Sequence, residues 1–145
     1  MDIDQARRKV EAAEEFIHGS TLVLSLFQIV YGLILIFKGA GLWTADIYRV
    51  AASVPGAPTS WGVVSILLGI MLYITQRKKY YRLIKWTCRG SAVWAMWLAI
   101  AFTISGFTTE DQEYDWTSAT PLAVYSTFAL LFILRERLAR AWETS

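Results

Sequence analysis

The chain has 145 residues, of which 55% are apolar and 14% aromatic, and its formal net charge is +2. This composition is too hydrophobic for an ordinary soluble domain of this length. Its single cysteine, Cys88, excludes an intrachain disulfide and disfavours a cysteine-based metal site. Four long stretches without Asp, Glu, Lys or Arg account for most of the chain. A helix needs roughly 20 mostly apolar residues to cross a bilayer, so we expect an all-α bundle of four transmembrane helices.

The first predicted element is a short cytoplasmic helix over residues 2–17. Apolar residues recur in it at every third or fourth position, which places on one face Ile3, Ala6, Val10, Ala13 and Ile17. We expect this face to lie on the membrane or on neighbouring helices, and a short self-associating coiled coil is the alternative. A cytoplasmic protein partner of this helix is a further hypothesis.

The first membrane span is expected over residues 19–37, ended by Gly39 and Gly41. Residues 42–54 then alternate apolar and polar positions at helical spacing, which predicts an interfacial helix on the outer side. Pro55–Pro58 should stop that helix. Thr59 or Ser60 can cap the next one.

The remaining elements follow in order from the charge pattern. They are the second span at 61–76, a basic connector at 77–86, the third span at 87–107, an acidic outer loop at 108–116, the fourth span at 117–134 and a cytoplasmic tail at 135–145 that is helical to about Trp142. Pro121 falls in the first turn of the fourth span, where proline is tolerated.

The charges also predict the orientation of the chain. With both termini in the cytoplasm, twelve of the fourteen Lys and Arg lie on the cytoplasmic side, and only Lys38 and Arg49 lie outside. The inverted arrangement would place those twelve outside. The positive-inside rule therefore favours a multi-pass protein of the cytoplasmic membrane with both ends inside.

Small residues recur along two of the predicted spans. The third span carries Ser91, Ala95, Ala99 and Thr103 at intervals of four, and the second carries Gly62, Ser65 and Gly69. Small side chains let helix backbones approach closely in lipid. These residues are expected to pack the helices of one chain together, or, as the alternative, to contact other copies in a homo-oligomer.

A polar stripe runs along the first span. It consists of Thr21, Ser25 and Gln28, and Gln28 should lie near the bilayer centre. Its amide needs a partner there because lipid offers none. An interhelical hydrogen bond is one interpretation, and the lining of a water-filled lumen after oligomerisation is the other.

Residues that could act in catalysis, proton transfer or metal binding are scarce in the predicted spans. None has an Asp, Glu, Lys or Arg at mid-membrane depth, which argues against an ion-coupled pump or a proton relay. His18 is the only histidine and Cys88 lacks a nearby base, so no catalytic residue, cofactor site or metal site is predicted.

The basic connector supplies the remaining candidate contacts. Its cations should contact the bilayer's anionic lipids rather than nucleic acid, and they are Arg77, Lys78, Lys79, Arg82 and Lys85.

The predicted topology and one stretch of sequence together resemble a known group of proteins. The stretch Tyr48–Gly62, YRVAASVPGAPTSWG, resembles small four-pass membrane proteins encoded by phages of actinobacteria. Many of these are treated as holin-like proteins of lysis cassettes, and similar ones as prophage exclusion proteins.

The resemblance implies a holin-like protein that oligomerises and permeabilises or depolarises the cytoplasmic membrane. A superinfection-exclusion or defence protein acting with a cytoplasmic partner is the first alternative, and a non-catalytic scaffold or assembly subunit is the second. A small membrane oxidoreductase comes last.

Overall fold

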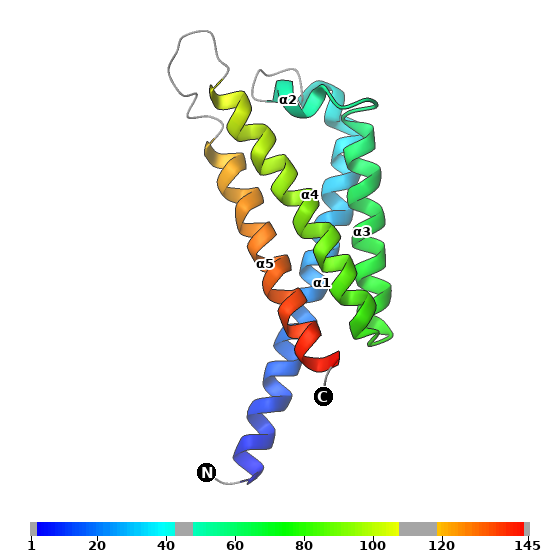
Figure 1. Cartoon of the computed structure of the whole chain (residues 1–145). Coiled ribbons are helices and arrows are strands. Elements are labelled where there is room, and N and C mark those ends of the chain that lie inside the picture. Colours follow the sequence, from blue (N-terminus) through cyan, green and yellow to red (C-terminus); the bar gives the residue numbers. More distant parts are fainter. Residues whose placement is uncertain (1–2, 43–47, 108–118, 144–145) are drawn as a thin grey trace.

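The computed structural model describes residues 3–42, 48–107 and 119–143 (Figure 1). This part of the chain is all-helical, as predicted, and contains no strand. Its helices are α1 (Ile3–Leu42), α2 (Arg49–Ala52), α3 (Thr59–Arg77), α4 (Tyr81–Phe107) and α5 (Ala119–Glu143). The acidic outer loop predicted at 108–116 lies outside the described residues.

The N-terminal region differs from the prediction of a separate helix at 2–17. That prediction is wrong, because α1 is one helix of 40 residues that passes through Gly19 without a break. A single glycine costs a helix only about 0.5–1 kcal/mol relative to alanine, and no proline interrupts the segment. Gly39 and Gly41 also fail to end α1, which continues to Leu42.

The interfacial helix predicted at 42–54 is present only in part among the described residues. Only Arg49–Ala52 form α2, and residues 43–47 lie outside the described part of the chain. α2 packs against α4, and the Trp61 indole donates a 3.0 Å hydrogen bond to the Ala51 carbonyl. The capping prediction is also wrong, because Pro58 occupies the N-cap of α3 and no side chain caps it.

One predicted boundary shifts towards a longer helix. The chain turns between Arg77 and Tyr81, so the second half of the predicted connector belongs to α4. The tail from residue 135 is helical, as expected, and forms the last part of α5, which ends at Glu143. The helical hydrogen-bond ladder continues past the apolar residues in both places.

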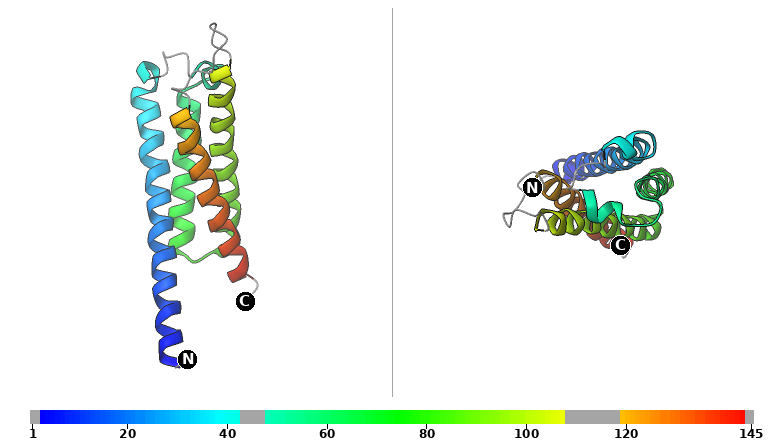
Figure 2. Two further views of the ribbon diagram at one scale, coloured as in Figure 1. Left: turned by 90° about the vertical axis from the view of Figure 1, so that its left-hand side faces the viewer. Right: turned by 90° about the horizontal axis from the view of Figure 1, so that it is seen from above.

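The helices pair as α1 with α3 and α4 with α5, and the two pairs pack into an elongated bundle (Figure 2). The first residues of α1 project beyond the bundle, on the side where the C-terminus also lies (Figure 1). We call residues 3–16 the extension. We call the end of the bundle next to the extension the entry end.

Three helices of the described chain are long and apolar enough to cross a membrane. They are α1 up to Gly39, α3 and α4. Their side chains that point away from the bundle are largely apolar and exposed, such as Leu26, Leu67 and Trp97. These features indicate a membrane protein, because such surfaces are stable in hydrocarbon and not in water.

Candidate functional site

The interior of the bundle is polar at its middle. Gln28 of α1 is fully buried there, and its side-chain oxygen accepts a 3.2 Å hydrogen bond from Ser91 of α4. Ser65 of α3 donates to the Gln28 carbonyl at 2.7 Å, and Ser25 donates to the Gly69 carbonyl at 3.0 Å. The polar side chains thus bond between helices, as membrane interiors require.

Glycines allow these short bonds to form. A Cβ on Gly62 would lie 2.7 Å from the Gly32 carbonyl oxygen, and one on Gly69 would lie 2.9 Å from the Ser25 carbonyl oxygen. The backbones of α1 and α3 are therefore in direct contact, so a larger residue has no space at either position.

A second polar layer closes the entry end, around Arg135 of α5. Only 3% of this residue is exposed. Its Nε donates to the Thr21 hydroxyl at 2.6 Å and one NH2 donates to the Gln76 side-chain oxygen at 2.7 Å. The Gln76 amide nitrogen lies 2.9 Å from Nδ1 of His18. This Arg135 layer therefore joins α1, α3 and α5.

The charge of Arg135 has no acidic partner among the described residues. Both of its hydrogen-bond acceptors are neutral, and its NH1 group is buried without a hydrogen bond. The guanidinium also makes a cation–π contact with the Trp142 ring, whose centroid lies 5.7 Å from the guanidinium carbon. Burying an unpaired charge is costly, which makes this residue the most unusual feature of the bundle.

Aromatic side chains pack between the helices at the depth of Gln28 and farther from the extension. Phe27 stacks on Phe128 with ring centroids 3.7 Å apart, and Tyr31 packs edge-on against Trp94. The hydroxyl of Tyr125 donates to that of Tyr31. These contacts link α1 to α4 and α5, which the polar residues alone would hold less firmly.

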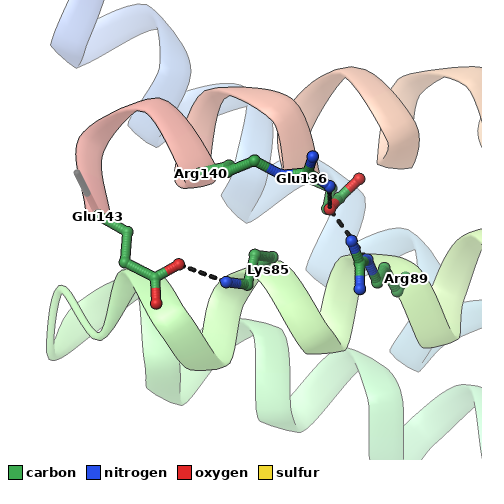
Figure 3. Close-up of polar contacts among 5 residues, drawn as sticks. All are labelled: Lys85, Arg89, Glu136, Arg140 and Glu143. Atoms are coloured by element: carbon green, nitrogen blue, oxygen red, sulfur yellow. Dashed lines mark hydrogen bonds and ion pairs between the residues drawn. The ribbon is translucent and has the colours of Figure 1, made fainter.

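Ion pairs join α4 to α5 at the entry end (Figure 3). Glu136 accepts hydrogen bonds from Arg140 at 2.7 Å and from Arg89 at 2.9 Å, and Lys85 pairs with Glu143. Mainly through the Arg140 hydrogen bond, this environment holds the pKa of the Glu136 carboxyl below its ordinary value.

The structure places the predicted packing residues as follows. Gly62, Ser65 and Gly69 are buried against α1. On α4, Ser91, Ala95 and Ala99 are buried within the chain, whereas Thr103 is half-buried and borders an outer groove shared with α5. The predicted contact between copies of the chain remains a prediction.

The residues of the predicted polar stripe all point into the bundle. Thr21, Ser25 and Gln28 are fully buried or nearly so. The interhelical hydrogen bond expected of Gln28 is present, although its amide nitrogen has no partner among the described residues. A lumen lined by this stripe would require the bundle to open.

The predicted lipid contacts divide into two groups. Arg77, Lys78, Lys79 and Arg82 are exposed around the turn between α3 and α4. Lys85 instead pairs with Glu143, so that its charge is already partly neutralised. Contact with anionic lipid remains a prediction for the other four.

A pocket of about 310 Å³ opens at the entry end, beside the Arg135 layer. It is lined by Glu11, Glu14, Glu15, His18, Gln76, Lys79, Tyr81 and Trp142. No group of three or more His, Cys, Asp or Glu residues in the described chain could hold a metal ion.

The burial of Arg135 and Glu136 was not predicted from the sequence. Both lie at the start of the expected helical tail, directly after an apolar run, and nothing in that pattern indicates that their side chains are buried. Gln76 and Thr21 carried a usable signal, since each is a polar residue at the same end of a predicted span as Arg135. Spans that end together bring such residues to one depth, where they can bond.

Comparison with protein-family models, with curated proteins and with solved structures found no match to the chain.

Proposed function

We propose that the chain is a non-catalytic membrane protein that holds a cytoplasmic partner protein beneath its bundle, through the extension of α1. The observation that carries this proposal is an exposed apolar stripe on the extension, formed by Ile3, Val10 and Ala13. Ile3 is 84% exposed and Val10 is 59% exposed. The extension is a charged helix that projects from a membrane protein and carries an apolar stripe. Such an amphipathic pattern is typical of a helix that binds a partner.

The stripe continues the inward face of α1. From the extension into the bundle, successive positions follow in steps of three, four or seven residues: Ile3, Val10, Ala13, Ile17, Thr21, Ser25 and Gln28. An α-helix has 3.6 residues per turn, so these residues share one side of α1. The stripe therefore faces the space beneath the bundle rather than the lipid around it.

This direction argues against a second copy as the partner. A second α1 packed in parallel on the stripe would run on, as a straight helix, towards the volume that α5 occupies. Arg135 of α5 already contacts Thr21 on that same face. The occupant is therefore an amphipathic helix that ends at the membrane surface, as in a cytoplasmic protein.

The proposed setting is a bundle of four membrane passes with both ends in the cytoplasm. α5 packs along α4. Together with the predicted start of the span at residue 117, its apolar segment up to Leu134 is long enough to cross a bilayer. The twelve-to-two charge asymmetry supports the orientation and the cytoplasmic membrane as its location.

The topology can be tested with two cysteine variants in a Cys88→Ser background, Lys79→Cys and Gln112→Cys. A membrane-impermeant thiol reagent on intact cells should label the second and spare the first. The reverse pattern would overturn the orientation, and labelling of both would overturn the number of passes.

The partner can be tested by photo-crosslinking in cells. A photoreactive amino acid at Val10 should give one adduct larger than the chain, whereas the same amino acid at Ala12, on the opposite face, should give none. An adduct of twice the chain's mass would show self-association instead. Equal adducts at both positions would contradict a stripe-specific partner.

Among the expected roles, a partner-dependent exclusion or scaffold protein fits this proposal best. A holin-like pore is the second candidate, favoured by the buried polar residues around Gln28. Expression of the wild-type chain alone should collapse the membrane potential if it forms a pore. An unchanged potential at high expression would exclude that role and leave the partner-binding role in place.

A further inference from the structure

An open groove separates α1 from α5 near the entry end. Its volume is about 680 Å³, and its lining includes Phe16, Gly19 and Val23 of α1 with Phe128, Leu131 and Arg135 of α5. α1 and α5 are not among the closely packed helix pairs of the described chain, which leaves this space between them. Ligand sites commonly measure about 300–1,000 Å³.

The groove is lined mostly by apolar side chains, and its one charged residue, Arg135, lies in the half nearer the extension. Val23, Phe128 and Leu131 lie on the stretches of α1 and α5 that we place in the membrane, and Arg135 follows directly after the apolar residues of α5. The groove thus runs from the proposed cytoplasmic surface into the adjoining leaflet. An amphipathic molecule with an anionic group and a hydrocarbon chain matches this order.

Arg135 also has unused capacity for an anion. Two of its nitrogen groups donate to Thr21 and Gln76, but NH1 donates to nothing in the part of the chain that the structure describes. No Asp or Glu of that part forms an ion pair with it. Arginine is well suited to bind phosphate oxygens, because its fork of donors matches their geometry.

From these observations we infer that the groove between α1 and α5 holds one phospholipid of the cytoplasmic leaflet, with its phosphate at Arg135 and an acyl chain along Val23 and Phe128. NH1 is buried among the described residues, so the phosphate reaches it when side chains that line the groove move aside. The inference rests on the proposed membrane placement of this end, but not on a protein partner.

Native mass spectrometry of the purified chain with added phosphatidylglycerol tests the site. The wild type should retain one phospholipid, and Arg135→Gln should weaken its binding by about tenfold, the usual effect of losing a charge-assisted hydrogen bond. Arg137→Gln is the matched control, because Arg137 is exposed on the same helix. Equal weakening by both variants would show non-specific attraction and overturn the site.

A second pair of variants decides the question if Arg135→Gln does not fold. A Cβ on Gly19 meets no atom within 4 Å, so Gly19→Leu should fill the groove without disturbing the bundle. Gly41→Leu is the control, since a Cβ at Gly41 is equally unobstructed. Gly19→Leu alone should lower retention of the lipid, and unchanged retention would overturn the proposal.

Inorganic phosphate separates a lipid site from a simple anion site. At millimolar concentration it should not displace the retained phospholipid, because it lacks the acyl chain that occupies the groove. Displacement by phosphate, together with full binding by Gly19→Leu, would show an anion site that does not use the groove.

Discussion

The two parts of α1 use the same side of one helix in opposite ways. Within the bundle that side carries Thr21, Ser25 and Gln28, which are buried and polar, while the lipid-facing side is apolar. In the extension the same side carries Ile3 and Val10, which are apolar, and most of the other residues are charged.

This contrast shows how the surroundings decide which side chains mark a contact surface. In hydrocarbon there is no hydrophobic driving force between helices, so close packing and hydrogen bonds join them. In water, burial of apolar surface provides the driving force, so an exposed apolar stripe marks the contact surface. The side of α1 that meets other helices thus changes in composition where the helix leaves the membrane.

The largest effect is expected from a bulky side chain at the contact between α3 and the bundle part of α1. Gly62→Leu would place a Cβ 2.7 Å from the Gly32 carbonyl oxygen, a backbone atom that cannot move aside cheaply. We expect destabilisation of about 3 kcal/mol or more, or loss of the fold. Thermal unfolding in detergent measures it, with Gly41→Leu as the control. Equal stability of the two variants would contradict the close backbone contact.

A smaller effect is expected at the Arg135 layer. Gln76→Leu removes one of the two acceptors of Arg135 and leaves that buried charge less satisfied, which should cost about 1–3 kcal/mol. Gln5→Leu makes the same change on the exposed extension and should leave the unfolding midpoint unaltered. If both changes have equal effects, the layer contributes nothing specific to the bundle.

Gln28→Leu should change stability less than Gln76→Leu does. Leucine removes the hydrogen bond from Ser91, but it also removes a buried amide nitrogen that has no partner among the described residues. These terms oppose each other, so we expect a net change within about 1 kcal/mol. A loss comparable to that of Gly62→Leu would show that the amide holds the bundle together.

The smallest effect is a pH dependence at Glu136. Its pKa is lowered in the folded chain, so its contribution to stability is present above the ordinary pKa and is lost as pH falls towards the lowered one. Because Arg89 and Arg140 are about half exposed, the contribution should not exceed about 1 kcal/mol.

Unfolding midpoints at neutral and acidic pH test this dependence. Glu136→Gln should lower the midpoint at neutral pH, and its difference from the wild type should shrink as pH falls below the ordinary carboxyl pKa of about 4.3. Glu11→Gln removes the exposed Arg7–Glu11 pair of the extension and serves as the control. An equal difference at both pH values would assign the effect of Glu136→Gln to something other than its charge.

Sequence patterns predicted the helical class, the apolar segments and the polar face of α1. They failed at the boundary placed near Gly19, because no local feature stops α1 there. They also missed the Arg135 layer, since its members lie more than fifty residues apart and meet only through the packing of α1, α3 and α5. Burial at helix ends depends on which spans are neighbours, and a single sequence does not show that.

The claim that one side of α1 is partnered along its length can be tested most directly by thiol labelling. Val10→Cys and Ala12→Cys, each in a Cys88→Ser background, would be labelled in permeabilised cells and again after purification. We expect Val10→Cys to be protected in cells and to become reactive on purification, while Ala12→Cys reacts fully in both. Equal and full labelling of both variants in cells would contradict a partner on the stripe.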